Sequence, residues 1–229
     1  MDSWEVASRE ALLKERLLTG CVPKFLRRFS RIDIGIKADD GKVIKAEYYV
    51  SPAYLSIGNS SGFLRVPLTP QTAQDIASHY RCFLPTKKNV DDIYAAAKIK
   101  LQPIPLTEKR ETFGTFVEHH KLIERQRNDR KELIAGIKKD VVISSAVAKD
   151  PRPNRVAIYG WHKSDGSPIQ PLYTGYVDWF VDYSHGIRLV YEMIRVAGKW
   201  MHYREILNDP LLKRLLCDEE ACDVYEYSE

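Results

Sequence analysis

An alternating segment near the start of the chain constrains the fold most strongly. In residues 30–38, SRIDIGIKA, an isoleucine occupies every second position from 32 to 36. Side chains two residues apart lie on the same face of a strand, so this spacing predicts a half-buried strand. The DDGK sequence at 39–42 predicts a hairpin turn, because Asp-Gly accepts the positive φ of a tight turn. A return strand over 43–50 completes the predicted hairpin.

The remaining pattern predicts further strands at both ends of the chain and helices between them. Thr69 followed by Pro70, and Thr86 before a run of helix-forming residues, are typical N-caps. Apolar residues at helical spacing predict a third central helix. The expected strands cover 30–38, 43–50, 53–58, 63–68, 140–147, 155–162, 175–183, 185–196 and 199–206, and the expected helices cover 5–18, 69–80, 87–98, 107–127 and 209–216.

This order of elements predicts an α+β fold. Antiparallel strands lie at both ends of the chain, with a central group of about three helices. We expect a single domain over 1–229, with room for a sub-boundary near residue 150 and a loose acidic tail over 218–229.

Composition narrows the class of protein and its partners. Hydrophobic residues make up 44% of the chain and charged residues 29%, which is typical of a globular domain. The net charge of +4 is too small to indicate a nucleic-acid partner, and no apolar run reaches the roughly 20 residues that span a bilayer. The first 20 residues lack the apolar core of a signal peptide. We therefore expect a soluble, cytoplasmic monomer with no membrane partner.

The four cysteines do not form a recognisable framework. Cys217 and Cys222 are five positions apart, outside the CxxC spacing of zinc and redox sites, and Cys21 and Cys82 stand alone. We read all four as free thiols.

The segment VDYSHGIRLV, residues 181–190, carries the strongest candidate for catalysis. His185 opens a predicted strand, and an imidazole there can take and return a proton at neutral pH. Cys82 lies shortly before a predicted helix, whose N-terminus would favour a thiolate nucleophile. Asp182 or His202 could orient the imidazole. Gly186 would leave room for a substrate.

The order of these residues resembles a known family. SHGIRLV, with Cys82 at a helix start before it and His202 as a polar third member after it, is similar to the His-led strand of NlpC/P60-type, papain-like cysteine peptidases. The Cys-to-His separation is about twice that of compact members, and a proline lies between Cys82 and its helix. The resemblance implies hydrolysis of an amide bond. We expect a hydrolase of acyl or amide bonds that needs no cofactor.

Two alternatives use the same segment. His162, Asp182 and His185 could hold a metal ion that activates water, provided that the chain turns through residues 183–184. The other alternative is a domain that binds glycans or peptides without catalysis.

Residues 159–188 hold the densest set of polar and aromatic side chains, so we expect them to line the principal cleft. The partner would be a peptide, a glycan or another small-molecule substrate. Arg188 falls on the opposite face of the predicted strand from His185, and we assign it no catalytic role. The expected substrate-binding residues are Tyr159, Trp161, His162, Asp178, Trp179 and Tyr183.

A basic run, KFLRRFSR at 24–31, places aromatic residues between its charges. Such a run could contact phosphates, or its charges could simply lie in water at the end of an element.

Overall fold

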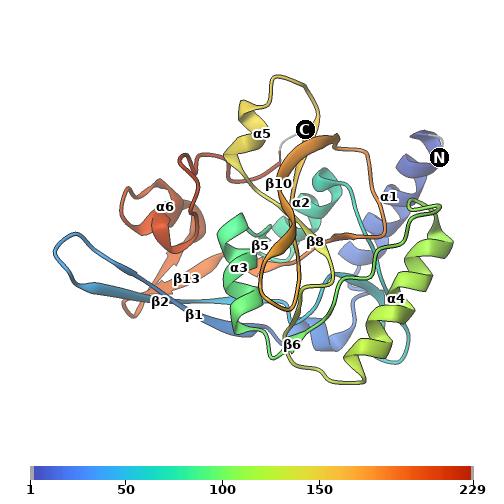
Figure 1. The fold of residues 1–229 in the computed structure, drawn as a ribbon, viewed down its shortest axis with the longest axis horizontal. Coiled ribbons are helices and arrows are strands. Elements are labelled where there is room, and N and C mark those ends of the chain that lie inside the picture. The colour runs from blue at the N-terminus through green and yellow to red at the C-terminus, as the bar shows by residue number, and fades with distance from the viewer. Residues whose placement is uncertain (1–2, 228–229) are drawn as a thin grey trace.

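A computed structural model describes residues 3–227 of the chain, with side chains from residue 6 onward. Helices and antiparallel strands are mixed along it, which confirms the expected α+β class. The hairpin of β1 (Ser30–Lys37) and β2 (Val43–Val50) projects at one end of the molecule, and α1 (Ser3–Leu18) and α4 (Phe113–Arg127) lie at the other (Figure 1).

The hairpin predicted from the isoleucine repeat is confirmed. β1 and β2 pair antiparallel along the whole of both strands. Gly41 adopts a φ of 86° in the connecting turn, the conformation for which Asp-Gly is suited. Ile32 and Ile36 are buried against the core, whereas Ile34 is half-buried. The period of two residues therefore locates both the strand and its inner face.

Two larger sheets are built from the described residues. The first has six strands in the order β14-β13-β2-β12-β5, with β1 also paired to β2. The second has the order β10-β9-β8-β11, in which β11 runs parallel to β8. The other strands of the first sheet are β5 (Cys82–Phe83), β12 (Val190–Tyr191), β13 (Met193–Val196) and β14 (Lys199–His202). The second sheet contains β8 (Lys139–Val142), β9 (Arg155–His162), β10 (Pro168–Val177) and β11 (His185–Gly186). Two short pairs complete the strands: β3 (Ser56–Gly58) with β4 (Phe63–Arg65), and β6 (Ile99–Lys100) with β7 (Ile134–Ala135).

Two of the central helices begin where their capping residues predict. Thr69 accepts a hydrogen bond from the Thr72 backbone at the start of α2 (Pro70–His79). Thr86 forms a capping box at the start of α3 (Lys87–Ala96). The shorter helical elements are η1 (Lys24–Arg27), α5 (Ser145–Lys149), α6 (Tyr203–Asn208) and η2 (Leu212–Leu215).

The third central helix starts later than its composition suggests. α4 begins at Phe113, after the cap Thr112, so residues 107–112 lie outside it. The reason is tertiary: this segment crosses to residues 182–183, where the Tyr183 backbone N–H donates to the Arg110 carbonyl. A backbone that forms such long-range bonds is not free to form helical ones.

The C-terminal strands are shorter than predicted. The expected strand over 185–196 is divided into β11, β12 and β13, and the one over 199–206 ends at His202, which caps α6. The strand expected over 175–183 ends at residue 177, and the one over 140–147 ends at residue 142 before α5. The last predicted helix is the 3-10 turn η2. The alternation of apolar and polar residues predicts the buried segments in this part of the chain, but it does not predict the bends between them.

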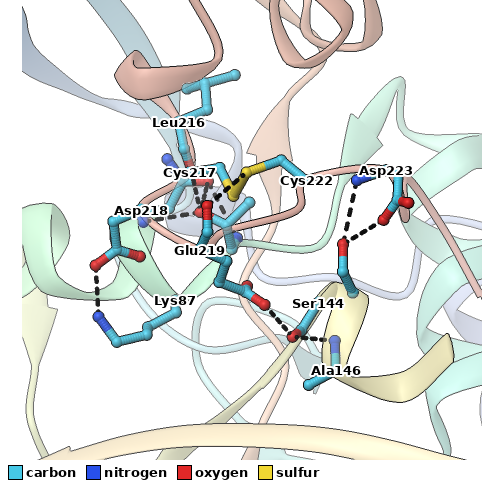
Figure 2. The surroundings of a disulfide bond; sticks show 12 residues. Lys87, Ser144, Ala146, Leu216, Cys217, Asp218, Glu219, Cys222 and Asp223 are labelled. Carbon is cyan, nitrogen blue, oxygen red and sulfur yellow. Dashed lines mark hydrogen bonds and ion pairs between the residues drawn. A yellow bond between two sulfur atoms is a disulfide. The ribbon is translucent and has the colours of Figure 1, made fainter. Parts of the chain in front are cut away.

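The cysteine assignment needs one correction. Cys217 and Cys222 form a disulfide, whereas Cys21 and Cys82 are free. The bond closes a short loop in the C-terminal segment, and Figure 2 shows that Asp218 and Glu219 within this loop point to Lys87 and Ser144. The expected cytoplasmic location stays a prediction, and disulfides are more typical of oxidising compartments.

Further bonds fasten the acidic segment beyond the loop. Asp223 accepts a hydrogen bond of 2.5 Å from the Ser145 hydroxyl. The Tyr227 hydroxyl donates to the Val142 carbonyl and accepts from the Ala157 N–H, at 2.7 and 2.9 Å. The segment expected to be loose therefore packs on β8 and β9 as far as residue 227. Residues 228–229 lie outside the described chain.

Reduction of the disulfide should lower the free energy of unfolding by about 2 kcal/mol, because the unfolded chain regains the entropy of a six-residue loop. Urea unfolding with and without dithiothreitol measures this change. The double variant Cys217→Ser, Cys222→Ser should be less stable by a similar amount and insensitive to dithiothreitol, and Cys21→Ser should retain the wild-type response. Equal stability of the oxidised and reduced wild-type protein would contradict the prediction.

Candidate functional site

A tight turn before β11 brings two of the predicted catalytic residues, Asp182 and His185, close to Ser184. Asp182 accepts hydrogen bonds from the Ser184 backbone N–H at 2.7 Å and from the Ser184 hydroxyl at 2.5 Å. The His185 N–H donates to the Asp182 carbonyl at 3.1 Å. Asp182, Ser184 and His185 are all at most 1% exposed. The chain thus turns through residues 183–184, a condition that only the metal alternative required, and Asp182 lies close to His185.

Residues 102–112, here called the strap, cross over this turn. The Leu106 N–H donates to the Tyr183 hydroxyl at 2.6 Å, and the Tyr183 N–H donates to the Arg110 carbonyl at 3.0 Å. Arg110 also forms an ion pair of 2.5 Å with Asp182, although its own side chain is 35% exposed. The strap therefore separates the turn from solvent.

Two lysines at the start of β8 lie on the inner side of the turn. The Lys138 ammonium donates to the Tyr183 carbonyl, and the Lys139 N–H donates to the Ser184 carbonyl at 2.8 Å. Burial and, to a smaller extent, nearby Arg65 lower the pKa of Lys138 to about 7, against the opposing effects of Asp182 and Asp140. Burial likewise lowers the pKa of Lys139, whose ammonium lies 5.0 Å from the centre of the Trp161 ring.

His185 is neutral at pH 7 in this environment. Burial lowers its pKa to about 4, and the cations Lys139, Lys138 and Arg110 act in the same direction against Asp182. Among residues 3–227, its Nε2 atom is buried and has no hydrogen-bond partner. The rings of Tyr176 and Phe180 lie 6.0 and 5.9 Å from the imidazole. An unpaired ring nitrogen of this kind is free to accept a proton.

Asp182 stays ionised. Burial alone would raise its pKa, but His185, the Ser184 hydrogen bonds and Arg110 together hold the pKa below its usual value. A carboxylate that accepts several hydrogen bonds and faces a cation favours its charged form.

A second histidine behind the turn was not predicted. His119 on α4 packs edge-on against Tyr183, with 4.8 Å between ring centres, and both of its ring nitrogens lack partners among the described residues. Burial, followed by Lys138 and Arg65, lowers its pKa far below the usual value. Nothing in the local sequence around His119 indicates that this helix packs on the turn.

Arg188 is buried, which the sequence analysis did not predict. It is 1% exposed. Its guanidinium donates to the Ser51 and Ile134 carbonyls at 3.0 and 2.9 Å, and its Nε atom lies 3.9 Å from Asp140. The alternation rule failed because residues 187–189 connect two sheets and do not continue one strand.

Gly186 does not open a path for a substrate. A Cβ atom there would lie 2.6 Å from the Tyr54 ring and 2.8 Å from the Lys138 side chain. Glycine is needed at this position because Tyr54 approaches the backbone closely, so the space beside His185 on this side is filled.

Cys82 and His202 belong to the other sheet. Cys82 lies in β5 opposite Tyr191, and His202 ends β14 opposite Met193. The Cys82 thiol is 3.3 Å from the Tyr80 carbonyl, and burial raises its pKa to about 12. In the described chain, no hydrogen bond or ion pair joins either side chain to His185. A role for either residue stays a prediction.

His162 has different partners from those that the metal alternative requires. Its Nε2 atom lies 3.1 Å from Asp91, which also accepts a 2.7 Å hydrogen bond from the Tyr159 hydroxyl. Its ring stacks on Tyr94 with 4.4 Å between centres. Between residues 3 and 227, no three His, Cys, Asp or Glu side chains form a group that could hold a metal ion.

The other expected substrate-binding residues are dispersed. Trp161 is 7% exposed beneath Lys139, whereas Trp179 is 53% exposed. Asp178 accepts a 2.7 Å hydrogen bond from Gln71 on α2. A cavity of about 530 Å³ beside the C-terminal segment includes Asp178, but a larger cavity of about 620 Å³ takes no residue from 159–188. The prediction that this segment lines the principal cleft is therefore wrong.

Comparisons with protein-family models, with curated proteins and with solved structures found no match. No helix in residues 3–227 is both long and apolar enough to cross a membrane. We therefore infer the function from the geometry and electrostatics of the site itself.

Cys82 should react slowly with iodoacetamide in the native protein, because its thiol is 5% exposed and holds its proton at neutral pH. Cys21 is half-buried and should be alkylated first. Peptide mass spectrometry after timed labelling measures both rates, with Cys82→Ser as the control. Fast labelling of Cys82 that His185→Gln slows would instead support the cysteine mechanism.

His185 should make stability fall on acidification. Its pKa is about 4 in the folded protein and near 6.5 when unfolded, so below pH 6.5 the unfolded state binds the proton more strongly. Its contribution therefore decreases from pH 6.5 to 4, by at most about 1.4 kcal/mol per pH unit. Urea unfolding should give a shallower pH dependence for His185→Gln than for the wild type. The exposed His79, replaced by Gln, is the control, and parallel curves for wild type and His185→Gln would contradict the assignment.

Proposed function

We propose that the chain is a hydrolase of acyl or amide bonds in which His185 is the general base. The observation that carries this proposal is the buried, unpaired Nε2 atom of a neutral imidazole beside an ionised carboxylate. Leaving a buried polar atom unpaired costs about 1–3 kcal/mol, so such an atom is a candidate for a functional role. Perturbed pKa values in the same cluster point in the same direction.

The arrangement supports a specific division of roles. His185 takes a proton from the attacking water as its oxygen adds to the carbonyl carbon, and returns this proton to the leaving group. Asp182 positions the imidazole and stabilises the imidazolium formed in between. Lys139 and Arg110 supply positive charge for the oxyanion that develops on the carbonyl oxygen. Lys138, with a pKa of about 7, is available as a second proton carrier.

Water fits this site better than Cys82 as the nucleophile. The thiol lies in the other sheet, and its raised pKa disfavours the thiolate. The resemblance to NlpC/P60-type peptidases therefore supports this proposal only through the histidine-led strand, and the proposed nucleophile differs from theirs.

Substrate access requires the strap to move. Its contacts with the turn are the bonds of Leu106 and Arg110 to Tyr183 and the ion pair of Arg110 with Asp182. Loops held by a few polar contacts can open on the microsecond-to-millisecond timescale. A peptide with an anionic group would compete with Asp182 for Arg110 and so favour the open form.

A non-catalytic glycan-binding domain is the second candidate, because aromatic side chains are exposed on and after β10. Tyr173 is 45% exposed and Trp179 is 53% exposed. Exposed aromatic faces are suited to stacking on sugar rings. This function needs neither His185 nor the strap.

Hydrolysis of p-nitrophenyl acetate and of acetyl-alanine p-nitroanilide tests the proposal. His185→Gln should lower kcat/KM about 100-fold or more, because a general base contributes at least that much. Asp182→Asn should also lower it. The acid limb of the pH profile should fall near pH 4, where His185 becomes protonated.

The matched control is Asp33→Asn, which removes an exposed carboxylate from the other sheet and should leave kcat/KM unchanged. Circular dichroism verifies that each variant is folded. Wild-type activity in folded His185→Gln would contradict the hydrolase proposal. A wild-type protein without activity, together with a Trp179→Ala variant that no longer binds a glycan array, would likewise favour the glycan-binding function over the hydrolase.

A further inference from the structure

The largest cavity described above lies away from the strap and the Asp182–His185 turn. This cavity has a volume of about 620 Å³ and is here called the η1 cavity. Residues from the end of α1, from η1 and from the end of α2 line it, together with Leu189. Small-molecule sites commonly occupy 300–1,000 Å³, so this volume is that of a ligand pocket.

The interior of the η1 cavity is apolar. Burying a hydrocarbon chain against such a surface contributes about 0.8 kcal/mol per CH₂ group. The apolar side chains that line it are Leu18, Val22, Leu26, Phe29, Leu55 and Leu189.

The cavity lining carries a positive charge on Arg27. His79 also lines the cavity, and no Asp or Glu is present in its lining. The Arg27 guanidinium donates one hydrogen bond of 3.1 Å to the Gly20 carbonyl, which holds it at the cavity, and no carboxylate among the side chains described, residues 6–227, pairs with it. A guanidinium has five N–H donors, so most of those on Arg27 remain available for an anion.

The basic run at 24–31 thereby gains an explanation. Leu26 and Phe29 of this run face the cavity together with Arg27, whereas Arg28 does not line it. In this run, aromatic and aliphatic residues alternate with basic residues. One short segment around η1 therefore supplies both apolar side chains and the positive charge of Arg27 to the cavity.

We propose that the η1 cavity binds a single-chain anionic amphiphile, with its acyl chain among the apolar side chains and its carboxylate or phosphate on Arg27. This site is separate from the proposed hydrolytic centre and takes no residue from it.

Sodium decanoate, below its micellar concentration, is the probe. Chemical-shift mapping on the ¹⁵N-labelled chain should show saturable changes at Thr19, Gly20 and Leu189. Decyltrimethylammonium, which has the same chain and the opposite charge, should bind more weakly. Stronger binding of the cation, or changes that map elsewhere, would overturn the proposal.

Two pairs of variants test where the acyl chain and the head group of decanoate bind. Arg27→Gln should weaken decanoate binding about fivefold, as expected for one exposed ion pair, and Arg28→Gln should not. Leu18→Trp should fill the cavity and abolish binding, whereas Ala11→Trp, on an exposed position of the same helix, should not. Equal affinities within both pairs would refute the site.

A vesicle-binding experiment distinguishes binding of a free amphiphile from binding to a membrane surface. Vesicles of phosphatidylglycerol should bind no more protein than vesicles of phosphatidylcholine. If the protein binds anionic vesicles but not monomeric decanoate, the basic run acts as a surface patch and the cavity proposal is wrong. The shift mapping on the wild-type chain decides the matter even if Leu18→Trp does not fold.

Discussion

The buried guanidinium of Arg188 connects the two sheets, and the rest of the structure is arranged around it. It binds the carbonyls of Ser51, at the end of β2, and of Ile134, in β7, and it lies near Asp140 in β8. Its Cζ atom is 4.1 Å from the centre of the Tyr54 ring. Removing a charge from water is costly unless hydrogen bonds and an opposite charge compensate, and these partners supply both. The carbonyls that Arg188 satisfies belong to segments where regular pairing stops, so the same bonds fix the junction of the sheets.

Asp140 shows how this junction influences the candidate site. Burial raises its pKa to about 6, against the opposing effects of Arg188 and His162. The negative charge of Asp140 also acts to raise the pKa of neighbouring Lys138, whose ammonium donates a hydrogen bond to the Tyr183 carbonyl. Charges therefore alternate from Arg188 through Asp140 and Lys138 to Asp182. In a medium of low polarity these charges interact strongly, which is why several groups near His185 have displaced pKa values.

Much of the fold was predictable because its signals are local. The isoleucine period, the Asp-Gly turn and the caps Thr69 and Thr86 each act over a few residues, and the structure confirms them. Of the candidate site, the sequence singled out His185 and Asp182, but the turn between them was only a condition of the metal alternative. The sequence did not supply Arg110 and His119, because nothing in the local sequence shows that the strap and α4 pack on that turn.

Other failures had a common physical origin. The burial of Arg188 depends on carbonyls 137 and 54 positions away, which the prediction of one strand over 185–196 does not include. The Lys138–Asp140 run lies between Ile137 and Val141, and charges set into an apolar strand could have drawn attention to it. The disulfide lies outside the usual motif spacing. Each feature depends on tertiary contacts that residue patterns do not encode.

Residues 185–191 show how closely the two proposed sites are placed along the chain. His185 begins this segment at the hydrolytic centre, and Leu189 lines the η1 cavity four residues later. Between them the segment is pinned to residues 51–55: Leu55 donates to the Ile187 carbonyl at 2.8 Å, and Ser51 donates to the Leu189 carbonyl at 2.9 Å. Residues 187–189 connect the two sheets, and the hydrogen bonds at Ile187 and Leu189 hold this connection to residues 51–55, so a displacement at Leu189 would strain these bonds. The Arg188 junction, which also binds the Ser51 carbonyl, therefore lies between the cavity and the catalytic turn along the chain and ties both to the same segment, because Ser51 and Leu55 line the cavity as well.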